Sequence, residues 1–148
     1  MEPYLYYYYL NLVHEHEGAI MAKILLVEDD DLVRDMLTQI LKRAGHDIIC
    51  ATNGEEATEY LRNDQPDIMV TDIIMPKKSG ITLISEVKNR HPNLEIIAIS
   101  GGGRLDPTGY LDLSETLGAS VSFEKPIDNN ALLMAIDLLL HGKKVKTP

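Results

Sequence analysis

The sequence predicts an α/β fold in which a five-stranded parallel sheet carries helices on both faces. Two patterns indicate this class. Short continuous apolar runs, typical of strands buried on both sides, alternate with longer segments whose apolar residues recur every three or four positions. The alternation repeats five times between residues 21 and 141. Strict alternation of strands and helices, joined by right-handed crossovers, produces a parallel sheet between two helical layers.

The first two strand–helix units are predicted between residues 23 and 63. The run KILLV predicts a strand at Lys23–Val27, and the amphipathic helix after it ends at Gly45, because glycine commonly terminates helices. The run DIICA predicts the second strand at Asp47–Ala51. Asn53 is a favoured helix cap, so the second helix is expected over Glu55–Asn63.

The next two units follow the same pattern. A third strand is predicted at Asp67–Thr71, and Ser79 can cap the helix after it, which must end before Pro92. The run EIIAIS predicts the fourth strand at Glu95–Ser100. A glycine-rich loop, GGGRLDPTG, separates this strand from a weaker helix expected at about Tyr110–Leu117.

The last unit is short. A strand is predicted at Ser120–Phe123, and Asp128 or Asn129 can cap the helix that contains ALLMAIDLLL. Gly142 and the basic residues after it favour the end of this helix.

The domain organisation is one domain with a short segment at each end. At 148 residues and 45% hydrophobic content, the chain has enough apolar residues for one core. Residues 1–20 carry five of the seven tyrosines, no lysine or arginine, and no small-residue cleavage site after an apolar core, so they do not resemble a secretory signal. We expect residues 1–20 to be an extension, by hypothesis a translated leader before Met21, with an aromatic docking segment as the alternative. The domain is then 21–141 and the tail 142–148.

Composition excludes several partner classes. The net charge of −9 and the pI near 4.9 argue against nucleic acid and against an anionic membrane surface, since both would repel the chain. No apolar run is long enough to span a membrane. Cys50, the only cysteine, is expected to be a small core residue, and the lack of a disulfide partner fits a reducing compartment. A cytoplasmic protein is expected.

Polar residues with compatible chemistry follow four of the five predicted strands. Carboxyl ends of parallel strands share one edge of the sheet, where sites form in folds of this kind. Converging carboxylates need a cation, and oxygen ligands suit magnesium. A hydroxyl and an ammonium beside them could neutralise a phosphoryl group, and an aspartate near the centre could accept it covalently. The residues concerned are Glu28, Asp29, Asp30, Asp72, Ser100 and Lys125.

Four motifs in this order resemble the response-regulator receiver domains of two-component signalling (CheY-like). They are ILLVEDDDLVR, DIMVTDIIMPKKSG, IIAIS and FEKPI, and the match runs from about residue 23 to residue 140. The resemblance implies a flavodoxin-like sheet with strand order 2-1-3-4-5.

The resemblance also implies roles for the residues at the sheet edge. Asp72 matches the phosphoaccepting aspartate. Magnesium would be held by Asp29 and Asp72 directly, by the backbone carbonyl of Ile74, and by Glu28 through water. Ser100 matches the hydroxyl that turns toward the phosphoryl group.

Lys125 matches the lysine that pairs with the phosphoryl group, and the bond between Lys125 and Pro126 is expected to be cis. Ser122 departs from the family pattern, because many members carry a switch aromatic at this position. Signalling by an aromatic side chain that swings inward is therefore not expected.

The expected function is acceptance of a phosphoryl group on Asp72 from a phosphohistidine of a histidine kinase or a histidine phosphotransfer protein. The signal would then pass by protein contact through residues 101–117, with Tyr110 as a candidate contact. The chain would catalyse only its own phosphoryl transfer and dephosphorylation.

Two alternatives stay open. One is a phosphohydrolase of the haloacid-dehalogenase type, because DDDLV (Asp29 to Val33) fits a D-x-D-x-[TV] nucleophile pattern. Against it, Leu32 replaces that family's usual glycine, and no further acidic metal-binding motif follows Lys125. The other alternative is a degenerate receiver that binds partners without phosphorylation.

Overall fold

The structure is a computed structural model of the chain, and it describes residues 20–101, 107–142 and 145. At 107, 108, 110 and 111 it describes the backbone alone. The extension at residues 1–19 and most of the glycine-rich loop therefore lie outside the described residues.

Five parallel strands form a single sheet in the order β2-β1-β3-β4-β5. This confirms the expected fold class and strand order. The two central strands β1 and β3 pair directly, with Val27 opposite Thr71. The strands are β1 Lys23–Val27, β2 Asp47–Ala51, β3 Ile68–Asp72, β4 Glu95–Ser100 and β5 Val121–Glu124.

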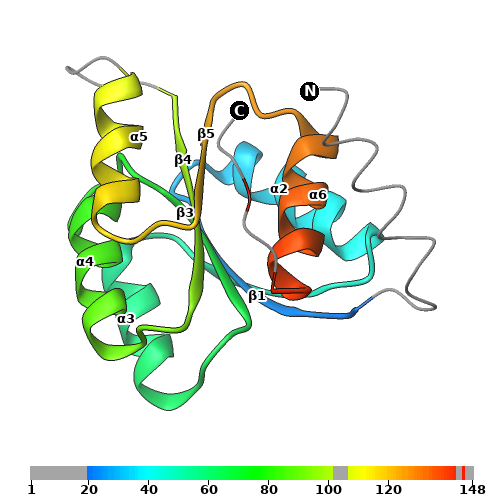
Figure 1. Cartoon of the computed structure of the whole chain (residues 1–148), viewed down its shortest axis with the longest axis horizontal. Coiled ribbons are helices and arrows are strands. Elements are labelled where there is room, and N and C mark those ends of the chain that lie inside the picture. The colour runs from blue at the N-terminus through cyan, green and yellow to red at the C-terminus, as the bar shows by residue number, and fades with distance from the viewer. Residues whose placement is uncertain (1–19, 102–106, 143–144, 146–148) are drawn as a thin grey trace.

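Helices cover both faces of the sheet (Figure 1). Helices α2 and α6 lie on one face, and α3, α4 and α5 lie on the other. Among the described residues, no helix combines the length and the apolar character needed to cross a membrane. The helices are α2 Asp31–Arg43, α3 Gly54–Asn63, α4 Gly80–Arg90, α5 Pro107–Thr116 and α6 Asn129–Leu140.

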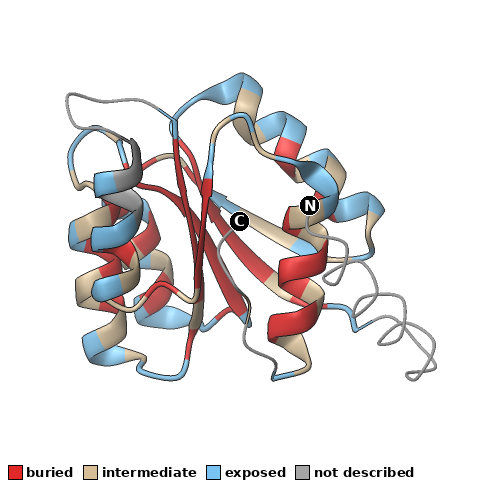
Figure 2. Ribbon diagram, turned by 45° about the horizontal axis from the view of Figure 1, so that its top comes forward, coloured by how far each residue is buried: buried red, intermediate tan, exposed pale blue. Residues whose placement is uncertain are grey.

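The core consists of two apolar layers, one on each face of the sheet. Successive side chains of a strand point to opposite faces, so Ile24 and Leu26 pack toward α2 and α6, while Leu25 and Val27 pack toward α3 and α4. Strand β3 is accordingly buried along its whole length, and β1 is buried at every residue after Lys23, as Figure 2 shows. This double burial explains why their sequences are continuous apolar runs rather than alternating ones.

Most helices begin at a side chain that accepts hydrogen bonds from the first turn. Asn53 accepts one from the amide of Glu56, and Ser79 accepts one from the amide of Thr82, as the sequence predicts. Of the two candidates for α6, Asp128 is the cap. Each cap satisfies backbone donors that would otherwise lack a partner.

Two expectations from the sequence were wrong. Cys50 is exposed rather than part of the core, because β2 is an edge strand, and its sulfur lies 3.4 Å from the Thr38 hydroxyl. Helix α5 begins at Pro107, three residues before the expected start at Tyr110. Proline suits a first helical turn, since its missing amide hydrogen has no partner to lose there.

Candidate functional site

The carboxyl ends of the strands bring the predicted polar residues to one edge of the sheet. Glu28 follows β1, Asp72 is the last residue of β3, and Ser100 is the last residue of β4. Lys125 directly follows β5. Asp72 pairs with Ile99, and Ser100 pairs with Glu124, so the register holds the strand ends level.

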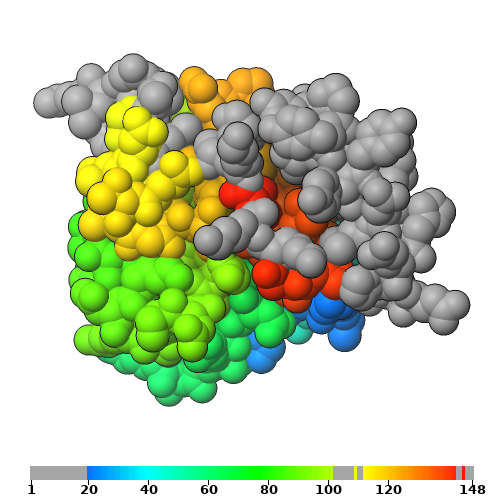
Figure 3. All heavy atoms as spheres, viewed as in Figure 1, coloured from blue at the N-terminus to red at the C-terminus, as the bar shows by residue number. Residues whose placement is uncertain are grey.

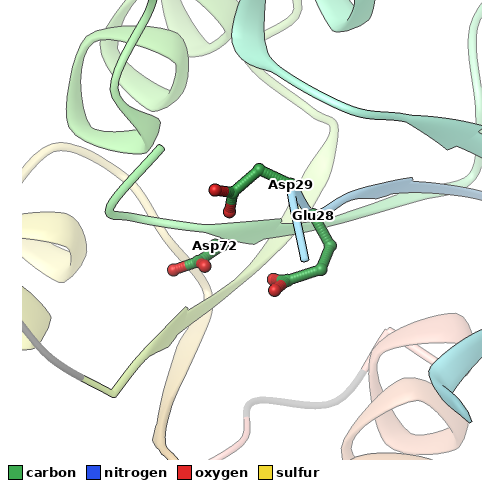
Figure 4. Close-up of side chains that lie close together, drawn as sticks. All are labelled: Glu28, Asp29 and Asp72. Atoms are coloured by element: carbon green, nitrogen blue, oxygen red, sulfur yellow. The ribbon is translucent and has the colours of Figure 1, made fainter. Parts of the chain in front are cut away.

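Three carboxylates from this edge form an acidic cluster. One oxygen from each of Glu28, Asp29 and Asp72 lies within 4.8 Å of the others. Figure 4 shows the three side chains grouped beyond the ends of β1 and β3. Glu28 and Asp72 are buried, at 1% and 5% exposure, whereas Asp29 is exposed. The cluster therefore has a buried floor and one open side.

Lys125 holds the two buried carboxylates together. Its ammonium group donates to Glu28 Oε1 at 3.2 Å and to Asp72 Oδ2 at 3.1 Å. Burial lowers the pKa of Lys125, but the negative charges of Asp72 and Glu28 raise it more, so the net shift is upward. The lysine is thus charged at neutral pH.

The surroundings of Glu28 shift the pKa of its carboxyl group upward. Burial raises its pKa from 4.5 to about 7, and the negative charge of Asp72 adds to this shift against the opposing effect of Lys125. Its Oε2 atom is buried and has no hydrogen-bond partner among the described residues. A buried carboxylate oxygen without a partner is costly, which favours a cation or a proton at this position.

The turn after β3 shapes the surroundings of Asp72. The amide of Ile74 donates to Asp72 Oδ1 at 3.2 Å. The amide of Gly80 donates to the Ile73 carbonyl at 2.8 Å, which closes the turn at the start of α4. A Cβ atom on Gly80 would lie 2.2 Å from the Asp72 carbonyl oxygen, so only glycine fits this approach.

Ser100 is fully buried at the end of β4, and its hydroxyl has no hydrogen-bond partner among the described residues. Its carbonyl accepts a hydrogen bond from the amide of Lys125 at 2.9 Å, which links the end of β4 to the start of the loop after β5. An unpaired buried hydroxyl can take up a new acceptor without first breaking a bond.

Gly101 leaves room for the Lys125 side chain, and the sequence motifs did not indicate this role. A Cβ atom at Gly101 would lie 2.3 Å from the Lys125 Cβ and 2.5 Å from its Cδ, so the missing side chain leaves room for the lysine stem. The available signal was a glycine directly after Ser100. The peptide bond between Lys125 and Pro126 is cis, as expected.

The residues present fit a hard divalent cation. The acidic cluster offers only oxygen ligands, and one of them, Glu28 Oε2, is buried without a partner. Magnesium is bound in proteins through one or two carboxylates together with water and phosphate oxygens. The exposed Asp29 leaves the open side that such ligands require.

Two other acidic residues near β1 do not join the cluster. Asp30 caps α2 by accepting from the amides of Leu32 and Val33. Asp31 lies in the first turn of α2 and pairs with Arg34 at 2.5 Å. The second aspartate of the D-x-D pattern is thus engaged elsewhere, which argues against the phosphohydrolase alternative.

At the position of the family's switch aromatic, Ser122 is buried on β5. Its hydroxyl lies 3.2 Å from Glu115 Oε1 and donates a hydrogen bond to it, linking β5 to α5. The side chain of Tyr110 and residues 102–106 lie outside the described residues, so the expected contact surface is described only in part.

Comparisons with known proteins agree on one family. Residues 24–137 match the response regulator receiver domain family. The chain is similar to the transcriptional regulatory protein CpxR of Escherichia coli (33% identity over 120 residues, 81% of this chain and 50% of CpxR). It is also similar to the sporulation initiation phosphotransferase F of Bacillus subtilis (29% over 114 residues, 77% of this chain and 90% of that protein).

A solved structure supports the same assignment. The CheY-like receiver domain protein of Methanospirillum hungatei superposes with a TM-score of 0.75 at 25% identity, over 83% of this chain and 96% of that one. The chain spans half or less of the length of the transcriptional regulators that it matches. Both the sequence match and the strand order identify the same fold. The chain therefore belongs to the response-regulator receiver domain family.

Proposed function

We propose that the chain accepts a phosphoryl group on Asp72 from the phosphohistidine of a histidine kinase or a histidine phosphotransfer protein. The observation that carries the proposal is the position of Asp72 in the acidic cluster, 3.1 Å from the Lys125 ammonium. A carboxylate in a charged site with one open side is a suitable nucleophile for an aspartyl phosphate.

In the reaction, a carboxylate oxygen of Asp72 attacks the phosphorus atom. The new oxygen–phosphorus bond forms as the phosphorus–nitrogen bond breaks, and the bonding electron pair leaves with the imidazole. The transition state carries negative charge on the three equatorial oxygens of the phosphoryl group. Catalysis therefore depends on the position of the reacting groups and on electrostatic stabilisation of this charge.

Magnesium would be held by Asp29, Asp72 and the Ile74 carbonyl, and by Glu28 through water. When bound, it would supply positive charge to the phosphoryl oxygens. The buried, unpartnered Glu28 Oε2 supports this ligand set, because it lacks the hydrogen bond that a buried acceptor normally has.

Lys125 and Ser100 would respond to the new phosphoryl group. Lys125 bridges Glu28 and Asp72, and the dianion would draw its ammonium outward. The unpaired hydroxyl of Ser100 would then donate to a phosphoryl oxygen. Both changes favour a second arrangement of residues 101–117, which we propose as the contact surface for a downstream protein.

Beryllofluoride with magnesium tests this proposal, because it forms a stable mimic of the acyl phosphate on an aspartate. In backbone amide NMR spectra, we expect large shifts that spread from Asp72 to residues 100–117. The Asp72→Asn variant should lose these shifts, since the amide cannot take part in the reaction.

Asp31→Asn is the matched control, because it changes an acidic residue near the cluster that pairs instead with Arg34. Its beryllofluoride response should equal that of the wild type. A chain without any magnesium-dependent change would instead be a degenerate receiver. Turnover of a small phosphate ester that depends on Asp31 would reinstate the phosphohydrolase alternative.

A further inference from the structure

A hollow of about 300 Å³ lies between α3 and α4, and no residue of the acidic cluster lines it. Its floor is apolar and is formed by the buried side chains of Leu61 and Val87. Arg62 near the end of α3 and Arg90 at the end of α4 also line it. The volume is at the lower end for ligand sites, large enough for one apolar side chain.

The charge around the hollow is not balanced internally. Arg62 pairs with Glu59 at 2.5 Å, and Glu86 pairs with Lys78 at 2.6 Å. The Arg90 side chain is exposed and makes neither an ion pair nor a hydrogen bond among the described residues. The rim therefore keeps one uncompensated guanidinium group, although the whole chain carries a net charge of −9.

Lys78 holds the walls of the hollow in place. Its ammonium group donates to Thr58 Oγ1 on α3 at 3.0 Å and to Glu86 Oε2 on α4 at 2.6 Å, and both residues line the hollow. A Cβ atom on Gly54 would lie 2.8 Å from the Lys78 carbonyl oxygen, so the start of α3 packs directly on this loop. A site whose walls are already tied together loses little entropy when it binds.

The surface that includes α4 faces solvent, as the green part of Figure 3 shows. A neutral apolar ligand would pack against the floor but leave Arg90 without an ion pair. An inorganic anion would pair with Arg90 but would not pack against the apolar floor. The combination favours a ligand that carries an apolar group and a carboxylate on neighbouring units. A peptide that contains an aliphatic residue next to a glutamate or aspartate provides both.

We propose that this hollow is a docking site for an acidic segment of a partner protein. A leucine-sized side chain of the segment enters between Leu61 and Val87, and a neighbouring carboxylate pairs with Arg90. The site uses neither the acidic cluster nor a phosphoryl group, so it is independent of the function proposed above.

The test uses a blocked tetrapeptide of alternating glutamate and leucine, added to the unphosphorylated full chain while amide NMR spectra are recorded. We expect concentration-dependent shifts that centre on residues 58–62 and 86–91. A peptide with lysine in place of glutamate should bind at least about fivefold more weakly, as should the acidic peptide to Arg90→Glu.

Arg43→Glu is the matched control, because Arg43 is also an exposed arginine in the last turn of a helix, but on the opposite face of the sheet. It should bind the acidic peptide like the wild type, and Arg90→Lys should retain most of the affinity. The proposal is overturned by shifts elsewhere, by no shifts at millimolar peptide, or by equal binding of the acidic and basic peptides. Dispersed amide spectra of each variant establish that it is folded.

Discussion

The sheet carries one lysine–carboxylate pair at the carboxyl ends of its strands (the carboxyl edge) and another at their amino ends (the amino edge). The two pairs differ in their exposure to solvent. At the carboxyl edge, Lys125 lies 3.2 Å from Glu28, whose side chain is 1% exposed. At the amino edge, Lys23 lies 2.8 Å from Asp64, and the two side chains are 37% and 46% exposed. Water screens the shorter contact, between Lys23 and Asp64, more strongly. Burial is therefore a better guide than distance to the strength of the electrostatic interaction in each pair.

The carboxyl pKa values shift in opposite directions at the two edges. Burial raises the pKa of Glu28 to about 7, despite its lysine partner. The hydrogen bond from Lys23 lowers the pKa of Asp64, and bonds from the Gln65 amide and the Tyr60 hydroxyl act in the same direction. At the amino edge, hydrogen bonds stabilise the charged form of Asp64. At the carboxyl edge, the charged form of Glu28 is destabilised by burial, so a bound cation can still stabilise it.

The largest expected effect of a substitution is at Gly80, on the carboxyl edge. In Gly80→Ala, the new Cβ would meet backbone atoms of Asp72 and Ile73 at 2.2 and 2.6 Å, so the turn must shift. We expect urea denaturation to show a loss of about 3 kcal/mol in the free energy of unfolding. Gly109→Ala is the control: a Cβ there meets nothing within 4 Å in helix α5, and stability should not fall.

Glu28 makes stability depend on pH. Its carboxyl pKa is about 7 in the folded chain, against 4.5 ordinarily. Between these values, the folded chain keeps a proton that the unfolded chain has lost, so stability falls as the pH rises through this window. The contribution is about 3 kcal/mol, measured by denaturation across the pH range. Glu28→Gln should remove this slope, and Glu55→Gln, an exposed change, should retain it.

Removal of the lysine that bridges the two buried carboxylates comes next. Lys125→Met leaves Glu28 and Asp72 without their shared cation, and we expect a loss of about 2 kcal/mol in the free energy of unfolding at pH 8. The loss should shrink below pH 7, because a proton on Glu28 then removes one of the two negative charges. A loss that is the same at pH 6 and pH 8 would contradict this account of the cluster.

The smallest effect is expected at the amino edge. Lys23→Met removes an ion pair that water already screens, so the denaturation midpoint should change far less than in Lys125→Met. The Asp64 carboxyl pKa should rise toward its ordinary value, which NMR titration of the side chain can follow. A loss of stability equal to that of Lys125→Met would break the comparison between the two edges.

The sequence patterns located the strands to within one residue. The strands at Lys23–Val27, Asp47–Ala51 and Glu95–Ser100 agree with the structure, whereas β3 and β5 begin and end one residue later than expected. Asp72 belongs to β3 because Ile99 on the neighbouring strand pairs with it. A reading of hydrophobicity ends a strand at the first charged residue, although backbone pairing does not depend on the side chain.

The candidate site was predicted less completely than the fold. Motifs placed Glu28, Asp29, Asp72, Ser100 and Lys125 at one edge, and the structure brings them there. The bridge from Lys125 to both buried carboxylates, the orphaned Glu28 oxygen and the space at Gly101 were not foreseen. Each depends on the distance between atoms of segments that are far apart in the chain. A sequence motif does not give such distances.

The sequence alone determined the alternation of strands and helices, the caps Asn53 and Ser79, and the chemistry available at the strand ends. These features follow from local periodicity and from the hydrogen-bonding capacity of single side chains. Only the tertiary structure decided that Cys50 is exposed, that Lys125 pairs with Glu28, and that a hollow opens between α3 and α4. Burial and electrostatic coupling depend on which segments pack together, and packing is a property of the whole folded chain.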